Sequence, residues 1–343
     1  MPLIRFPFVT FILAIFFISV FAASEHVDQQ GQKLCKNLHQ RHEWRTLTDT
    51  QKADYIKAVK CLQAHPAKDP VYPESKTRFD EFQGWHVDQA DYVHLVGQFL
   101  GWHRHFLQLY ENALRNECGY EGYSPYWDWT QDADSTSSIM GSPVFDPITG
   151  FGGDGVPGTY VVPPNIPADQ LVFPEDFRGC VQDGPFANYT VTLGPGKLKT
   201  THCLTRGISN ENAQYLTSKA LANITSQPTF ALFRVQLEGR PITPTPRIHD
   251  GGHFAVGGEM SNFYSSPADP LFFLHHANID RVWWNWQQML PERLYEIAGS
   301  STYPPTVNVT LDQPLEMPKS FGETVPLWKV MNIHSEYNCY TYV

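Results

Sequence analysis

Two blocks of the chain concentrate the histidines, the residues with the clearest capacity for chemistry. The first block holds three of them and the second holds four: His86, His94 and His103, then His249, His253, His275 and His276. Neutral imidazole binds copper, zinc, iron and nickel, and a set of three leaves a coordination position open for a small molecule. A single buried histidine is usually a hydrogen-bonded core residue. Burying six without a shared partner would cost about 1–3 kcal/mol each, which favours metal binding.

In the second block, His249 and His253 are four residues apart. On a helix both rings would share one face, about 6 Å apart along the axis, although Gly251 and Gly252 leave a regular helix uncertain. A downstream helix offers the third ligand, because His276 lies on the same apolar stripe as Phe272, Ile279 and Trp283 and so points into the core. His275 is rotated by roughly 100° from its neighbour, so only one of the pair is expected to bind the same ion.

In the first block, His103 also belongs to an apolar stripe, formed by Phe106, Leu107, Tyr110 and Leu114. His86 and His94 are eight residues apart, about 12 Å on a continuous helix, which is too far for one ion at ligand distances of about 2 Å. If both bind, we expect the helix to break between them. Asp88 or Asp91 would cap a new start, or His94 would lie on a loop.

Two sets of three histidines suit the reduction of dioxygen. Reduction to the level of peroxide takes two electrons, and two Cu(I) ions about 3.5–4 Å apart supply one each. Two copper ions with dioxygen as co-substrate would therefore suit two such sets, although the histidines alone do not identify the metal.

Helices are expected to position both blocks. Thr48 and Gln51 form a capping box in an amphipathic stretch at 43–62, and further helical patterns cover 98–116 and 269–289. Residues 210–239 also favour helix, with interruptions at Pro228 and Gly239. A stretch rich in Gly and Pro at about 131–200 predicts irregular structure, and the tail after Met289 favours a few short strands. We interpret residues 24–343 as a single, mainly α domain with long loops.

Composition excludes some functions and indicates a compartment. A net charge of −10 without a basic cluster argues against nucleic acid and is compatible with a small uncharged substrate. Arg5, an apolar run at 6–21 and small residues at 22–24 predict a signal peptide over residues 1–23, rather than a membrane anchor. We expect a secreted, extracellular protein without stable membrane association after signal removal.

Cysteines and glycosylation sequons agree with secretion. All six cysteines follow the signal, which permits up to three disulfides of undetermined connectivity. Three sequons begin at Asn188, Asn223 and Asn308.

Two segments resemble the copper-binding regions of the tyrosinase and catechol oxidase family, the type-3 copper polyphenol oxidases. The first runs from Phe79 to Asp128 and contains WHRHF and YWDW, and the second runs from His249 to Trp284 and contains HDGGH and DPLFFLHHANIDRVWW. The resemblance extends upstream to about Cys35 and downstream to Tyr340 and Tyr342. It covers nearly the whole mature chain and is closest to short secreted fungal members.

The resemblance implies a four-helix bundle that holds two copper ions, with long loops and little sheet. It implies that His86, His94 and His103 bind one copper and that His249, His253 and His276 bind the other. The expected activity is oxidation of o-diphenols, with monophenols or o-aminophenols as further candidates, to o-quinones by dioxygen. The partner is then a small phenolic or catecholic molecule.

The sequence departs from the family pattern in three places. Tyr92 occupies the position of a cysteine that many members cross-link to histidine, so no thioether is expected. The chain ends at Val343, which predicts no C-terminal shielding domain. Asp250 follows His249 where an asparagine is associated with monophenol hydroxylation, and Glu238 is the plausible upstream acid.

Substrate contacts are also implied by the family pattern. Phe263 matches the gate position over the second copper, and Phe272 is expected to help hold the substrate ring by stacking. Structural roles for Asp250 and Phe263 are equally compatible with the sequence, so catechol oxidation is favoured over monophenol hydroxylation.

Two other functions fit the same histidines. A dicopper dioxygen carrier would use the same ligands without turnover, although the signal peptide and short length argue against it. A zinc hydrolase is disfavoured because no glutamate stands beside His253 as in HExxH.

Overall fold

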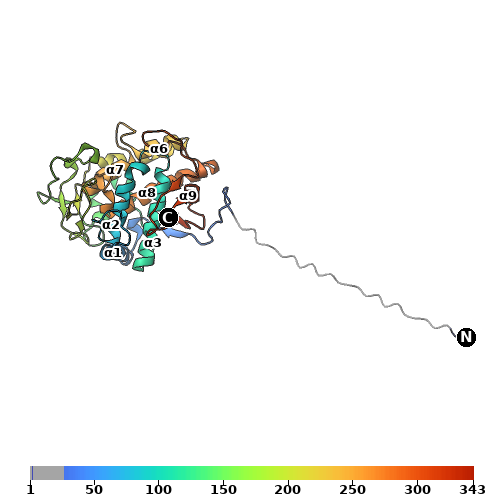
Figure 1. Ribbon diagram of the computed structural model, residues 1–343, viewed down its shortest axis with the longest axis horizontal. Helices are drawn as coiled ribbons and strands as arrows, with labels where there is room; N and C mark the ends of the chain where they lie inside the picture. Colours follow the sequence, from blue (N-terminus) through green and yellow to red (C-terminus); the bar gives the residue numbers. More distant parts are fainter. Residues whose placement is uncertain (1, 3–26) are drawn as a thin grey trace.

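Four helices carry the two histidine blocks and lie together in the helical centre of the molecule (Figure 1). A computed structural model describes Pro2 and residues 27–343, so the expected signal peptide lies almost wholly outside the described residues. The four helices are α2 (Arg78–Val93), α3 (Phe99–Cys118), α7 (Ile248–Val256) and α8 (Leu271–Gln288). The fold prediction is confirmed in class: a helical core with short strands.

Helix α1 (Asp49–Ala64) packs beside α2 and α3 and begins where the sequence predicts. The Thr48 side chain accepts a hydrogen bond from the Gln51 backbone, and the Gln51 side chain accepts one from the Thr48 backbone. Its buried face includes Tyr55, Val59 and Leu62, the apolar residues at three- and four-residue spacing. The local cap and the apolar stripe together determine this helix.

The remaining helices are short. They are α4 (Thr130–Ala133), α5 (Ser218–Thr225), α6 (Phe230–Glu238) and α9 (Trp328–Met331). Short 3-10 helices of three to five residues lie at Trp44–Thr46, Ile139–Gly141, Pro143–Phe145, Ala168–Gln170, Pro174–Asp176, Asn212–Leu216, Gly258–Ser261, Ser266–Ala268 and Pro291–Tyr295. Helix α6 ends at Gly239, whose φ of 99° suits glycine.

The strands form small sheets around the helices. Parallel β1 (His39–Arg41) and β9 (Tyr340–Tyr342) pair with His39 opposite Tyr340. The others are antiparallel: β2 (Gly155–Pro157), β3 (Gly179–Val181) and β6 (Thr205–Arg206) in one sheet, β4 (Thr190–Val191) with β5 (His202–Cys203), and β7 (Pro314–Leu315) with β8 (Val325–Pro326). Residues 131–200 thus contain only short elements between loops, as the glycine and proline content predicts.

The β1–β9 pair closes the chain against the central helices. The hydroxyl groups of Tyr340 and Tyr342 each donate to Asp280 of α8 at 2.6 Å, and Arg104 of α3 donates to the same carboxylate at 2.5 Å. All four side chains are largely buried. Asp280 therefore braces α8 against α3 and the C-terminal strand.

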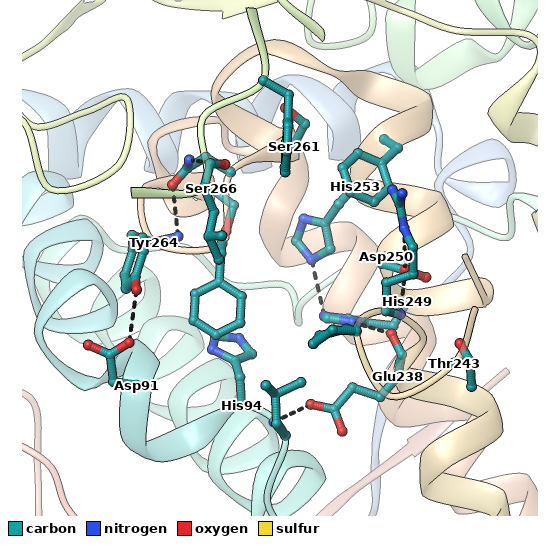
Figure 2. Close-up of a pocket in the computed structure, with 18 of the residues that line it drawn as sticks. Asp91, His94, Glu238, Thr243, His249, Asp250, His253, Ser261, Tyr264 and Ser266 are labelled. Atoms are coloured by element: carbon teal, nitrogen blue, oxygen red, sulfur yellow. Dashed lines mark hydrogen bonds and ion pairs between the residues drawn. The ribbon is translucent and has the colours of Figure 1, made fainter. Parts of the chain in front are cut away.

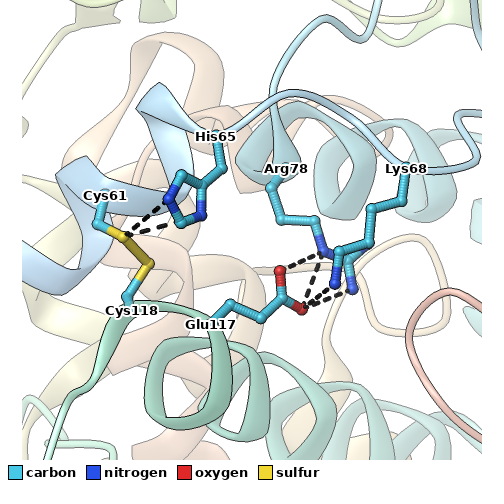
Figure 3. Close-up of a disulfide and its surroundings, with 6 residues drawn as sticks. All are labelled: Cys61, His65, Lys68, Arg78, Glu117 and Cys118. Carbon is cyan, nitrogen blue, oxygen red and sulfur yellow. Dashed lines mark hydrogen bonds and ion pairs between the residues drawn. A yellow bond between two sulfur atoms is a disulfide. The ribbon is translucent and has the colours of Figure 1, made fainter.

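Three disulfides use all six cysteines: Cys35–Cys339, Cys61–Cys118 and Cys180–Cys203. The Cys61–Cys118 bond joins the C-terminal ends of α1 and α3 (Figure 3). Beside it, Glu117 accepts hydrogen bonds from Arg78 of α2 and pairs with Lys68 at 2.9 Å (Figure 3). His65 also approaches this disulfide, but oxidised sulfur does not act as a thiolate ligand, so this cluster is structural.

The described residues contain no helix that is both long and apolar enough to cross a membrane.

Candidate metal centre

The first trio consists of His86 on α2, His94 directly after α2, and His103 on α3. All three are buried, and one ring nitrogen of each lies within 4.8 Å of the others. Helix α3 is amphipathic, so burial of its apolar face turns His103 inward.

The structure decides between the two alternatives for His86 and His94. Neither Asp88 nor Asp91 caps a new helix; α2 runs unbroken to Val93 and ends there, so that His94 is its C-cap residue and lies at the start of the following loop, as the second alternative predicts. The extended backbone of His94 (φ −107°, ψ 154°) allows its ring to turn back toward α2, where its centroid lies 5.1 Å from that of His86. On a continuous helix these two residues would lie about 12 Å apart along the axis, and the extended conformation of His94 brings its ring back to His86.

Backbone carbonyl groups fix the orientation of each ring in the first trio. The Nδ1 atoms of His86, His94 and His103 donate to the carbonyl oxygens of Tyr264, Ala90 and Phe99 at 2.8, 2.9 and 2.9 Å. A proton on Nδ1 leaves the lone pair of Nε2 free, which is the arrangement found in metal-binding histidines. The Nε2 atoms of His86 and His103 are buried and have no hydrogen-bond partner in the described part of the chain.

The second trio consists of His249 and His253 on α7 and His276 on α8. His253 Nε2 lies 3.2 Å from His249 Nε2 and 3.1 Å from His276 Nε2. The Nδ1 atoms of His249 and His253 donate to the carbonyls of Glu238 and Met260 at 3.1 and 2.8 Å. Their Nε2 lone pairs therefore face each other.

Such a cluster of lone pairs is repulsive unless a shared electrophile neutralises it. Metal bonds of about 2.0–2.1 Å in tetrahedral geometry place ligand nitrogens about 3.3 Å apart, close to the observed separations. The donor set and geometry therefore fit a bound transition metal.

Burial keeps the histidines neutral. Desolvation is the largest influence on all six and lowers each pKa below the ordinary value, to about 4 for His94. Neighbouring imidazoles lower the pKa of His103 and His276 further. Since a ligand must offer a lone pair, this environment favours metal binding at neutral pH.

His275 is not a member of the second trio and has another role. Its Nε2 donates to the backbone carbonyl of His249 at 2.9 Å, which ties α8 to the start of α7. Gly252 makes this approach possible, because a Cβ atom there would overlap the His275 ring. Both glycines of α7 are thus compatible with a helix, and Gly252 allows it to pack closely on α8.

The two trios meet where His103 stacks on His276, with ring centroids 4.5 Å apart and planes inclined by 10°. Phe272 is fully buried beside this contact, with its ring centroid 4.2 Å from His276 and 5.2 Å from His86. It does not line the neighbouring cavity. Its position suits a packing role beneath both trios, in place of the expected stacking on substrate.

A cavity of about 510 Å³ opens over the second trio. In Figure 2, His249, His253 and Asp250 lie on one side of it, while Asp91 and Tyr264 lie on the other. Apolar side chains form much of the wall, including Leu95, Leu171, Phe173, Phe254, Phe263 and Tyr303. Of the first trio, His94 reaches this cavity.

Phe263, the expected gate residue, packs against the first trio. Its ring centroid lies 4.5 Å from that of His94, and its side chain lines the cavity. The residue thus lines the cavity beside the first trio, whereas the family pattern implies a position over the second copper.

Glu238 and Asp250 also line the cavity, and both carboxylates already accept hydrogen bonds. Glu238 accepts from the Leu95 backbone at 2.5 Å and pairs with Arg234. Asp250 accepts from the backbone of Arg240 and Arg247 at 2.8 and 2.5 Å. Burial raises the pKa of Glu238 to about 7 and that of Asp250 to about 6.

Sequence reasoning missed the contacts that orient these groups. Leu95 has a φ of 63° directly after His94, and Arg234 is the buried partner of Glu238. The hydrogen-bonded pair between His202 and buried Glu259, with 2.6 Å between Nε2 and Oε1, was also not foreseen. The i,i+4 spacing of Arg234 and Glu238 was the only local signal.

A family model described as the common central domain of tyrosinase matches residues 76–289, which include both trios. The chain belongs to the tyrosinase family. Tyrosinase-like protein phomQ1 of Diaporthe leptostromiformis is 38% identical over 290 residues, which cover 77% of this chain and 66% of that relative. This chain therefore spans slightly less than two thirds of the fungal relative.

Two further similarities extend over most of both chains. N-acetyl-6-hydroxytryptophan oxidase ivoB of Emericella nidulans is 33% identical, with 90% of this chain and 93% of the relative covered. A solved polyphenol oxidase structure from Thermothelomyces thermophila superposes with a TM-score of 0.79 at 32% identity, covering 89% of each chain. The tyrosinase-like fold is therefore shown by sequence and by structure.

Proposed function

We propose that this tyrosinase-family chain is a dicopper oxidase that converts o-diphenols to o-quinones with dioxygen. The observation that carries the proposal is the convergence of two buried histidine trios, with five of the six Nδ1 atoms held by backbone carbonyls. His86, His94 and His103 would hold one copper, and His249, His253 and His276 the other. Copper bound there would supply one-electron redox chemistry and a binding site for dioxygen.

The chain's own residues bind the phenol and exclude water. The cavity reaches the second trio through His249 and His253, so the substrate hydroxyl approaches on this side. Phe263 and the apolar wall pack against the aromatic ring and limit solvent access. The relative from Emericella nidulans is named for oxidation of a hydroxylated tryptophan derivative, which supports a hydroxylated aromatic substrate here.

Catechols are the proposed substrates rather than monophenols. Monophenol hydroxylation needs a group that accepts the phenolic proton. The candidates are Glu238 and Asp250, whose carboxylates already accept hydrogen bonds from Arg234 and from backbone N–H groups. Both thus have partners within the protein, which favours a supporting role over acceptance of the phenolic proton.

Secretion is part of the proposal. Three disulfides suit an oxidising compartment, and Asn188, Asn223 and Asn308 are all exposed. The signal peptide over residues 1–23 stays a prediction.

The test is metal analysis of the purified protein combined with oxygen uptake on 4-methylcatechol and on p-cresol. We expect two coppers per chain and sustained turnover of the catechol alone. Sustained turnover of both phenols would establish monophenol hydroxylation as well. Reversible oxygen binding without quinone would indicate a carrier, and zinc in place of copper would refute the proposal.

A further inference from the structure

A single basic side chain lines the cavity over the second trio. Among the residues that the structure describes, the charged groups facing this cavity are Asp91, Glu238, Arg240 and Asp250. Three are carboxylates in a chain of net charge −10, and Arg240 is the one cation. Its side chain is 48% exposed, so it stands at the mouth.

The three carboxylates have partners within the protein. Asp91 accepts from the Tyr264 hydroxyl at 2.9 Å and pairs with Lys197 at 2.6 Å. Glu238 pairs with Arg234, and Asp250 accepts two backbone N–H groups. Their charge is thus already partly compensated.

The charge of the Arg240 guanidinium is compensated only weakly. The guanidinium donates no hydrogen bond within residues 27–343, and its nearest acidic contact is a long one, 3.9 Å from Nε to Asp250. The guanidinium carbon instead lies 4.7 Å from the centre of the Phe254 ring. Stacking on an aromatic face holds an arginine in place and leaves its outer N–H groups available.

The position of Arg240 relative to the trio follows from α7. Asp250 and Phe254, which Arg240 contacts, each directly follow a trio histidine, His249 and His253. Successive helix residues are rotated by about 100°, so the guanidinium lies over the face of α7 adjacent to the one that bears the histidines. A phenol ring at the second trio would direct a substituent toward it.

We propose that Arg240 is a substrate-binding residue that selects phenols bearing a carboxylate on a short side chain. The planar guanidinium forms paired hydrogen bonds with a carboxylate. Leu171, Phe173 and Tyr303 provide an apolar rim for the rest of the molecule. This inference deepens the proposed function and depends on it for the chemistry, but not for the binding of the acid.

The test compares two catechols of similar shape, one with a charged carboxylate and one with a neutral methyl ester. With 3-(3,4-dihydroxyphenyl)propionate and its methyl ester, we expect Arg240→Gln to raise KM for the acid about tenfold, the loss of one charge-assisted pair. In the same variant, KM for the ester and kcat for both substrates should change by less than about twofold. Arg240→Glu should reverse the preference, toward a catechol bearing an ammonium group.

Two further arms make the test decisive. Lys199→Gln removes the same charge from an exposed lysine outside the cavity and should alter neither KM. Calorimetric titration with unreactive 3-phenylpropionate and its amide measures binding without turnover. Selective binding of the acid that Arg240→Gln abolishes would support the subsite even if no catechol were oxidised, whereas equal effects on acid and ester would overturn it.

Discussion

The two histidine trios are held in different ways. In the first, His94 and His103 donate to carbonyls four residues earlier in their own helical segments, and His103 and His86 lie away from the cavity. In the second, His249 and His253 donate to carbonyls of Glu238 and Met260, outside α7, and both line the cavity. Two of the three rings of the first trio are thus held within their own helical segments, while His86 is held by Tyr264, and only His94 reaches the cavity. In the second trio the rings of His249 and His253 are both held from outside α7, and both are open to the cavity.

The largest effect should come from replacing one histidine of either trio. His103→Asn and His253→Asn are each expected to reduce copper from two ions per chain to one. Both should abolish catechol oxidation, because one ion cannot supply two electrons. Metal analysis and oxygen uptake measure both effects. If either variant kept two coppers and full activity, that histidine would not be a ligand.

A second prediction concerns Glu238, whose side chain and backbone serve different trios. Its carboxylate accepts from Leu95, next to His94, while its carbonyl accepts from His249. Glu238→Ala should therefore weaken copper at the first trio by about 10–100-fold, as other losses of support behind a ligand do, and affect the second trio less. Competition with a Cu(I) chelator measures the two affinities.

Two controls separate this effect from general loss of stability. Glu238→Gln keeps an oxygen that can accept from Leu95 and should restore much of the affinity. Glu292→Ala removes an exposed carboxylate that does not line the cavity and should change neither copper affinity. Equal weakening of both sites in Glu238→Ala would contradict the division of roles.

The third prediction tests how the second trio is assembled. Gly252→Ala places a methyl group against the His275 ring and should lower the free energy of unfolding by about 1–3 kcal/mol, despite the better helix propensity of alanine. Gly141→Ala is the matched control, since no atom lies within 4 Å of the added carbon. Thermal unfolding of both variants would show whether α7 requires this close approach. If Gly252→Ala were as stable as Gly141→Ala, the His275 ring would have to move aside at no cost, and the close approach would not be required.

The smallest effect is expected at the entrance. Phe263→Ala removes a ring that packs on His94 without touching the second trio, so KM for a bulky catechol should fall by less than about tenfold while copper content stays at two. Steady-state kinetics with 4-methylcatechol and 4-tert-butylcatechol would measure this. A loss of copper would instead assign Phe263 to the support of His94.

Much of the fold could be predicted because its determinants are local. The capping box of Thr48 and Gln51 and the apolar stripes of α1, α3 and α8 are readable within single segments. The turn of His94 is not, because it depends on the left-handed backbone of Leu95 and on a carboxylate 143 residues away. A non-glycine residue in this conformation needs tertiary support that no sequence pattern displays.

The candidate site shows the same division. The spacing of His249 and His253 indicates one face of a helix. The two glycines between them argue against a regular helix, and the sequence does not show that His275 packs on Gly252 and requires a glycine there. Phe272 was expected near substrate because its stripe faces inward, and the structure places it beneath both trios. Periodicity distinguishes inward from outward, but it does not distinguish a cavity wall from the core.

The most direct test of the central claim is X-ray absorption at the copper edge of the purified protein. Two trios so close together predict about three nitrogen ligands per copper at about 2.0 Å and a second copper at about 3.5–4 Å. Copper without a neighbouring copper, or zinc in both sites, would contradict the account.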